Sequence, residues 1–172
     1  TVEKETTTLK FDSLPEIDLW TLDNPVLYSI KMTLLLDGTA IDANSSRFGF
    51  REANFRPDGG FYLNGQRVKL FGLDRHQTYP YIGAAAPPRL QRLDADILKY
   101  ELACNIVRTS HYPQSPHFLD RCDEIGLLVF EEITGWQHIG DEAWQDICLA
   151  ELKTMIERDR NHASIMLWGV RV

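Results

Sequence analysis

The stretch NIVRTSHYPQSPHFLDRCDEIGLLVF, residues 105–130, decides the fold of this chain. Its two ends, Asn105–Arg108 and Leu127–Phe130, are short apolar runs that predict strands. Four apolar residues recur between them at helical spacing: Phe118, Leu119, Cys122 and Ile125. Gly126 follows this segment and is placed to end a helix in the left-handed conformation. A strand, a helix and a second strand in this order imply that the two strands are parallel.

The same alternation extends to both sides of this stretch. We expect a strand at Val68–Leu73 before it and a strand at Ser164–Trp168 after it. A helix should follow Pro87-Pro88, since proline fits a first helical turn, with one face formed by Leu90, Leu93, Ile97 and Tyr100. A further helix should begin near Asp141, with one face formed by Trp144, Cys148, Leu152 and Met155. Four parallel strands fit half of an eight-stranded barrel or a doubly wound sheet.

The first 55 or so residues show strand patterns only. Leu27–Gly38 alternates well enough for a half-buried strand and ends in Asp37-Gly38, a common hairpin turn. Ser45–Phe55 reads as another strand, and Asn64-Gly65 predicts a hairpin between two apolar runs. This part is typical of the end of a β-sandwich whose earlier strands are not present. We therefore expect two domains, 1–54 and 55–172.

The composition argues against two classes of binding partner. The chain has 172 residues, 44% of them hydrophobic, and a net charge of -7, which is typical of a globular protein with a core of its own. An acidic chain without a basic run is a poor candidate for nucleic acid or for an anionic membrane surface, so neither partner is expected. Three cysteines without a CxxC pair predict buried thiols and favour a reducing compartment, while localisation stays otherwise open: Cys104, Cys122 and Cys148.

Polar and ionisable residues follow the predicted strands one after another. The first strand leads into Asp74, Arg75 and His76, the second into residues 108–112, and the third into Glu131 and Glu132. A single histidine or a pair of glutamates has an ordinary structural explanation as a hydrogen-bonded or solvated group. Repetition at consecutive strands favours an active site, because the loops at the carboxyl ends of parallel strands converge.

At this point the residues resemble a known family. Residues 105–130, with Asn-x-x-Arg, Ser-His-Tyr-Pro and the later Asp and Gly, resemble the first signature of glycoside hydrolase family 2. The family includes β-galactosidases, β-glucuronidases and β-mannosidases. Residues 159–172, DRNHASIMLWGVRV, resemble its second signature without the last two residues. Phe48–Arg51 resembles the motif that closes the family's immunoglobulin-like sandwich, and residues 70–77 resemble its first barrel strand.

The resemblance implies a fold and a reaction. The fold is strands 1–4 of a TIM barrel, preceded by the last strands of an immunoglobulin-like sandwich. The reaction is retaining hydrolysis of a terminal β-linked sugar, β-galactosidase-like, by two carboxyl groups about 5–5.5 Å apart. The family's acid/base Glu is expected two residues after Val172, and the nucleophile lies farther along the barrel. No catalytic residue is therefore expected within the chain, and the chain alone should be inactive.

The resemblance also assigns sugar contacts. His76 is expected to hydrogen-bond sugar hydroxyls, and His111 is expected to line the pocket. Arg108 is expected to lie beneath the site, where it orients the nucleophilic carboxylate and keeps it ionised. Trp136 either faces the sugar or leaving group or packs locally, and we retain it as a substrate-binding candidate.

Three residues are expected to support the pocket from behind without touching the sugar: Glu131, Glu132 and Trp168. Glu132 would fix neighbouring polar groups, and Trp168 would pack at the end of its strand. The family often has Asn at the position of Asp74 and Glu at the position of Gln77, so neither residue is given a role.

No metal and no cofactor are expected. Some β-galactosidases hold magnesium through a Glu and a His in the loop after the third strand, and these positions are Trp136 and His138 here. Tryptophan offers no oxygen ligand, which magnesium requires. The expected partner is a carbohydrate substrate, and homo-oligomerisation of the full-length protein stays open.

Two other readings compete with the glycosidase. A carbohydrate-binding protein on the same scaffold could keep the pocket without catalysis, and the residue two positions beyond Val172 would distinguish it. A metal-dependent hydrolase could use a cluster of ligand-type residues: His76, His111, Glu131, Glu132 and His138. No HxH or HExxH spacing supports that second reading.

Overall fold

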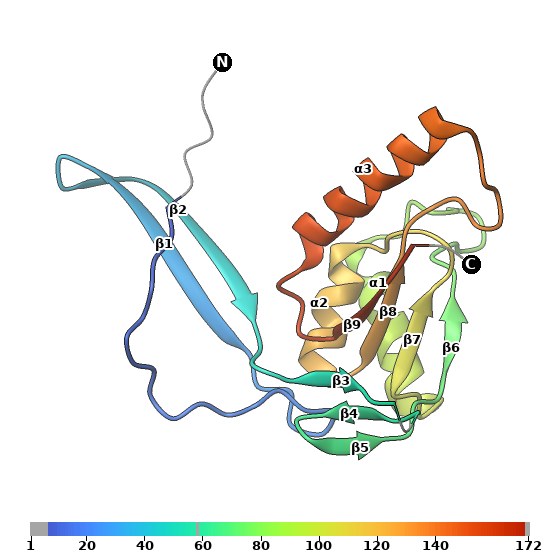
Figure 1. Ribbon diagram of the computed structural model, residues 1–172, viewed down its shortest axis with the longest axis horizontal. Helices are drawn as coiled ribbons and strands as arrows, with labels where there is room; N and C mark the ends of the chain where they lie inside the picture. Colours follow the sequence, from blue (N-terminus) through green and yellow to red (C-terminus); the bar gives the residue numbers. More distant parts are fainter. Residues whose placement is uncertain (1–6, 58, 171–172) are drawn as a thin grey trace.

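The computed structural model describes residues 7–57 and 59–170. Figure 1 shows three parts in chain order: a long β-hairpin, a small three-stranded sheet, and a four-stranded sheet with helices. The carboxyl ends of the four strands point to the top of the view, and the small sheet lies below their amino ends (Figure 1). The β-only part thus lies away from the edge at which the sequence places the polar residues.

The hairpin consists of β1 (Tyr28–Leu36) and β2 (Thr39–Phe48), which pair antiparallel. The predicted Asp37-Gly38 turn joins them, with both residues at positive φ. The prediction of one strand over Ser45–Phe55 was wrong in its bounds, because β2 begins directly after the turn and ends at Phe48, and residues 53–55 form a separate strand. Nearly all side chains of both strands are exposed. A strand without a buried face carries no hydrophobic alternation, so its start could not be read from pattern.

The small antiparallel sheet consists of β3 (Ala53–Phe55), β4 (Phe61–Leu63) and β5 (Gln66–Val68). The predicted Asn64-Gly65 turn joins β4 to β5 and is confirmed. The predicted strand Val68–Leu73 was misplaced, since Val68 ends β5 and the next strand, β6, is Gly72–Arg75. A largely apolar segment, residues 68–73 with Lys69 as its one charged residue, crosses from one sheet to the other, and hydrophobicity alone does not mark the boundary.

The larger sheet is parallel and keeps chain order. Its strands are β6, β7 (Ile106–Thr109), β8 (Leu128–Glu132) and β9 (Ile165–Gly169). The helices between them are α1 (Pro88–Asp96) with its π-helical extension η1 (Ile97–Glu101), α2 (Pro116–Ile125) and α3 (Glu142–Asp159). The predicted alternation and the parallel arrangement are confirmed, and this part of the chain is an α/β fold.

Local signals place the helix ends correctly. Asp141 caps α3, and its carboxylate accepts a hydrogen bond from the main-chain N–H of Trp144 at 3.0 Å. Gly126 ends α2 with φ +71°. A Cβ at this glycine would lie 2.3 Å from the main-chain oxygen of Leu22, so the close approach of the amino-terminal segment also requires glycine.

One face of the parallel sheet packs against α1 and α2. The core on this face includes Ala95, Leu98, Val107, Phe118, Leu119, Cys122, Ile125, Val129 and Ile165. The predicted face of α2 is therefore confirmed. The predicted face of α1 was wrong in part, because Leu93 and Tyr100 are exposed while Gln91 and Ala95 are buried. The buried polar Gln91 shifts the inward face away from the purely apolar stripe.

Helix α3 stands away from the sheet at the top of Figure 1. On the face predicted for it only Met155 is buried, and the other three predicted residues are partly exposed. Cys104 and Cys122 are buried as predicted, whereas Cys148 on α3 is partly exposed. Within residues 7–57 and 59–170, no helix is both long enough and apolar enough to cross a bilayer.

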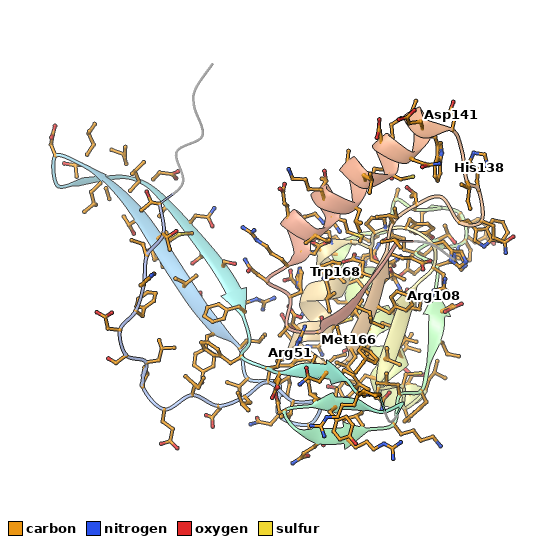
Figure 2. All side chains as sticks on the ribbon, viewed as in Figure 1. Arg51, Arg108, His138, Asp141, Met166 and Trp168 are labelled. Carbon is orange, nitrogen blue, oxygen red and sulfur yellow. The ribbon has the colours of Figure 1, made fainter. Side chains whose placement is uncertain are left out.

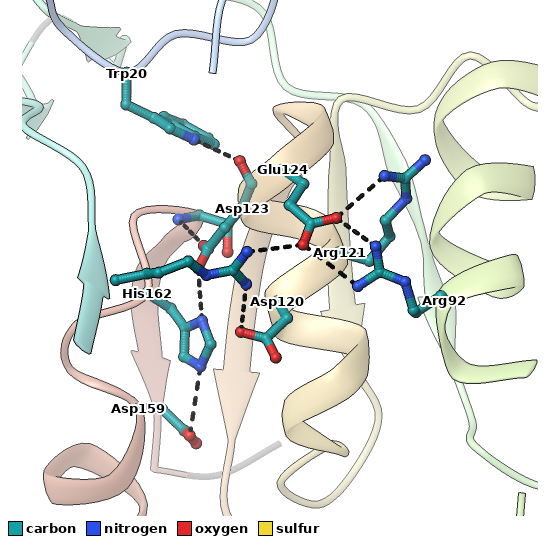
Figure 3. A network of polar contacts seen from close by, with 10 residues as sticks. Trp20, Arg92, Asp120, Arg121, Asp123, Glu124, Asp159 and His162 are labelled. Atoms are coloured by element: carbon teal, nitrogen blue, oxygen red, sulfur yellow. Dashed lines mark hydrogen bonds and ion pairs between the residues drawn. The ribbon is translucent and has the colours of Figure 1, made fainter. Parts of the chain in front are cut away.

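A set of contacts, here called the seam, fixes the amino-terminal segment to the parallel sheet. Trp20 is fully buried, and its indole N–H donates to the main-chain oxygen of Asp123 at 2.8 Å. Arg47 pairs with Glu124 at 2.8 Å, and Arg51 donates to two main-chain carbonyls at the amino end of β9. Figure 3 shows Asp123 and Glu124 on α2, between the amino-terminal segment and α1. The seam therefore lies at the amino ends of β8 and β9.

Candidate functional site

Arg108, His111 and Glu132 meet at the carboxyl edge of the parallel sheet. Arg108 lies on β7 (Figure 2), Glu132 is the last residue of β8, and His111 lies in the loop between β7 and α2. The Nε and Nη2 atoms of Arg108 donate to Oε2 of Glu132 at 3.0 and 2.9 Å. The Nδ1 atom of His111 lies 2.6 Å from Oε1 of the same carboxylate. The structure thus brings together three residues that the sequence placed after two consecutive strands, Arg108 and His111 after one and Glu132 after the next.

The Glu132 side chain is 0% exposed, and each of its oxygens has a fixed partner. A buried carboxylate needs compensation, which the Arg108 guanidinium supplies. Arg108 is itself 26% exposed and also lies 3.9 Å from the carboxylate of Asp74. Because both Glu132 oxygens are engaged, this residue is suited to orient Arg108 and His111 and is poorly placed to attack or protonate a ligand.

Aromatic rings border the same place. The rings of His76 and His111 are 5.6 Å apart and nearly perpendicular, at 76°. Trp136 stacks on His111, with ring centroids 5.9 Å apart and an interplanar angle of 18°. Trp136 is 58% exposed, so much of its ring surface is open to a ligand. The four predicted substrate-binding residues therefore form one cluster, with Tyr112 packed against His76 at 6.1 Å.

Glu131 and Trp168 lie on the opposite, helix-facing side of the sheet. They are register partners on β8 and β9, and Trp168 packs against the core under α1 and α2. Glu131 accepts a hydrogen bond from the main-chain N–H of Gln114 at 3.2 Å. Burial, followed by the nearby Asp159 carboxylate, raises the pKa of Glu131 to about 8. Neither residue faces the cluster around Glu132, and their support of the pocket stays a prediction.

A buried arginine was not recognised from the sequence. Arg75 is 5% exposed and lies over the ring of Phe118 at 4.1 Å. Its guanidinium donates to Asp94 at 2.9 and 2.8 Å, to Gln91 at 2.8 Å, and to the side-chain oxygen of Gln114. The sequence showed Arg75 at a strand end, but nothing in the pattern marks a charge as buried among three other elements.

Among the described residues, one group of three side chains has the types and spacing of metal ligands, and it does not include His138. His138 lies beside the start of α3 (Figure 2), and its ring packs against Trp144 at 5.1 Å. Asp120, Asp123 and His162 hold their ligand atoms within 4.8 Å of one another. These groups are already engaged, since Nδ1 of His162 lies 2.6 Å from Asp123 and Arg47 pairs with Asp120 at 2.7 Å. The group of Asp120, Asp123 and His162 is therefore explained as part of the seam. Burial tends to lower the pKa of His162, but the hydrogen bond and the charges of Asp123 and Asp159 outweigh this effect and raise it.

A cavity of about 560 Å³ lies elsewhere in the described part of the chain. It is lined by residues of β3, β4 and β5 and of the segments that follow β3 and β5, near the amino ends of the parallel strands. It shares no residue with the cluster around Glu132, so the polar and aromatic groups identify the candidate site better than cavity size does.

Comparison with known proteins agrees with this geometry. The sequence profile of the TIM barrel domain of glycosyl hydrolases family 2 matches residues 57–171, and a second profile of the same family matches residues 1–51. A β-galactosidase of Thermoanaerobacterium thermosulfurigenes is 56% identical over 169 residues, 98% of this chain and 23% of that protein. A β-galactosidase of Thermoanaerobacter pseudethanolicus is 60% identical over 153 residues, 89% of this chain and 21% of that protein.

Among solved structures, β-glucuronidase 3 of Bacteroides uniformis superposes with a TM-score of 0.83 at 38% identity, covering 90% of this chain and 20% of that one. The chain thus spans about a quarter or less of the length of these relatives. The matched profiles, the parallel α/β fold and the motif residues gathered at its carboxyl edge lead to one conclusion: the chain belongs to glycosyl hydrolase family 2.

Proposed function

We propose that this chain is part of a retaining β-galactosidase and that its four parallel strands are the first half of a TIM barrel. The strand order β6-β7-β8-β9 supports the barrel, because a doubly wound sheet reverses its order at a switch point. The packing of α1 and α2 on one face supports it as well. On this proposal, residues 1–54 end an immunoglobulin-like sandwich and residues 55–172 begin the catalytic domain.

The observation that carries the proposal is the Arg108–Glu132–His111 arrangement at the carboxyl edge. A retaining glycosidase needs hydrogen-bonding groups held in fixed positions around an oxocarbenium-like transition state. Glu132 holds Arg108 and His111 through both of its oxygens. In the proposed enzyme, His76 and His111 contact sugar hydroxyls, Arg108 orients the nucleophilic carboxylate, and Trp136 faces the sugar or leaving group.

The two catalytic carboxyl groups come, on this proposal, from residues beyond Val172. Glu131 and Glu132 lie on opposite faces of β8 and cannot bracket one glycosidic bond. Both oxygens of Glu132 are engaged, and Glu131 is fully buried. We expect Asn-Glu at the two positions after Val172, with this Glu as the acid/base, and the chain alone to be inactive.

Galactose is the sugar we propose. Relatives named β-galactosidase reach 56% and 60% identity, whereas those named putative β-glucuronidase reach 36% and 40%. A glucuronide carries a carboxylate that needs a cation of its own. Within the described part of the pocket the permanent cation is Arg108, and it is paired with Glu132. This charge balance favours a neutral hexose.

The test is expression of the protein from its complete coding sequence and assay on aryl β-galactosides and aryl β-glucuronides. We expect hydrolysis of the galactoside with retention of configuration, and a large loss of kcat/KM in His111→Ala. Preference for the glucuronide would refute the sugar assignment. Sugar binding without turnover, together with a residue other than Glu two positions after Val172, would establish the non-catalytic binding protein instead.

A further inference from the structure

Gln114 lies in the loop of residues 110–115, which carries His111 and Tyr112 from β7 toward α2. It is only 1% exposed. Its main-chain N–H donates to Glu131 at 3.2 Å, and its main-chain oxygen accepts from Arg158 at 2.9 Å. The loop is thus held from behind by β8 and by the end of α3.

The side chain of Gln114 makes a second, separate pair of bonds. Its oxygen accepts from Arg75, and its amide nitrogen donates to the main-chain oxygen of Tyr112 at 3.2 Å. Arg75 is a rigid anchor, because its guanidinium donates twice to the Asp94 carboxylate, at 2.9 and 2.8 Å. The side-chain amide therefore links a fixed cation at the end of β6 to the residue next to His111.

The burial of the Gln114 amide is informative because burying a polar group costs free energy. Burying a polar group is unfavourable unless its partners are present, and a satisfied polar network specifies one geometry where an apolar residue would allow several. The Gln114 amide has partners for both its oxygen and its nitrogen. Such a group suits a loop that has to present a side chain at one defined position.

We propose that Gln114 is a positioning residue for the sugar pocket. By joining Arg75 to the Tyr112 carbonyl, it fixes the 110–115 loop so that His111 reaches the sugar hydroxyl that it contacts. Glu132 holds the imidazole from the pocket side at 2.6 Å, and Gln114 holds the main chain from the helix side. The part of this inference that concerns sugar rests on the proposed function, whereas the part that concerns the loop does not.

The chain offers a matched control. Gln91 is also buried, at 2% exposure, and its side-chain oxygen also accepts from Arg75, at 2.8 Å, but it lies on α1 and makes no bond to the loop. Gln114→Met and Gln91→Met therefore each remove one bond to Arg75 and conserve side-chain length. Only the first removes the bond to Tyr112.

The first readout is hydrogen exchange of the loop amides in the complete protein. We expect exchange of residues 110–115 to rise at least tenfold in Gln114→Met and to stay within twofold of wild type in Gln91→Met. Equal exchange in the two variants would overturn the inference. If Gln114→Met does not fold, Gln114→Glu takes its place, because it keeps the acceptor for Arg75 and loses only the donor to Tyr112.

The second readout is kinetic and uses a double-mutant cycle. Gln114→Met should lower kcat/KM for an aryl galactoside by roughly tenfold to a hundredfold, since misplacing a contact by about 1 Å has effects of this size. In a His111→Ala background, Gln114→Met should lower kcat/KM no further. Gln91→Met should have the wild-type kcat/KM. Additive losses would mean that Gln114 does not act through His111. A wild-type protein without hydrolytic activity would refute the proposed function. The hydrogen-exchange result alone would then test whether Gln114 fixes the 110–115 loop.

Discussion

Replacing Glu131 with glutamine should stabilise the protein at alkaline pH and remove a pH dependence from its stability. Burial, followed by the Asp159 carboxylate, raises the pKa of Glu131 from 4.5 to about 8 in the folded state. Between these values the folded protein keeps a proton that the unfolded chain releases. Stability therefore falls as pH rises through this window, and the cost is complete above pH 8.

The size of the effect follows from the shift. One pKa unit corresponds to about 1.4 kcal/mol, so the full window amounts to roughly 4–5 kcal/mol as an upper bound. Glutamine is neutral at every pH, can accept the hydrogen bond from the Gln114 N–H, and can donate to Asp159. Glu131→Gln should equal wild type near pH 4.5 and exceed it progressively up to pH 8.

The assay is differential scanning calorimetry of the complete wild-type and variant proteins from pH 5 to pH 9. The difference in Tm should widen with pH and become constant above pH 8. Glu124→Gln is a control of opposite sign: burial tends to raise the pKa of Glu124, but hydrogen bonds from three arginines outweigh it and lower the pKa to about 2. Glu124→Gln should therefore destabilise the protein at neutral pH. A Tm difference for Glu131→Gln that is constant across pH, or a less stable variant at pH 8, would refute the reasoning.

Three further substitutions, one of them with a matched control, test close contacts. Gly169→Ala would place a Cβ 2.5 Å from Cβ of Glu132, so we expect at least a tenfold lower kcat/KM in the complete enzyme, and unchanged kinetics would contradict this. Gly126→Ala should lower Tm more than Gly38→Ala, because both glycines have positive φ but only Gly126 meets a main-chain oxygen, at 2.3 Å; equal losses would show that the close approach is unimportant. Trp20→Phe leaves the buried main-chain oxygen of Asp123 without its 2.8 Å donor and should lower the free energy of unfolding by about 1–3 kcal/mol, measured by chemical denaturation. KM should stay at the wild-type value, and a changed KM would mean that the seam affects the pocket.

The elements that the sequence predicted well carry their signals locally. The face and end of α2 follow from apolar spacing and from Gly126, and the start of α3 follows from Asp141. The start of β2 and the boundary between β5 and β6 carry no such signal, because β2 has no buried face and the boundary lies inside a largely apolar segment.

The candidate site shows the same limit. The positions of Arg108, His111 and Glu132 at one edge follow from the parallel alternation of strands and helices. The opposite orientation of Glu131 and Glu132 also follows from the two-residue period of a strand, although the sequence interpretation grouped them. The buried link from Arg75 to Gln114 depends on contacts among several elements, and no single segment encodes it.

The location of the seam has a consequence for how such a protein can change over time. Trp20 and Arg51 attach the amino-terminal segment at the amino ends of β8 and β9, whereas the polar cluster lies at the opposite ends of the same strands. Substitutions at the seam can therefore change how firmly the amino-terminal segment is attached without touching the polar cluster. Substitutions in the loops at the other edge can change the cluster without loosening this attachment.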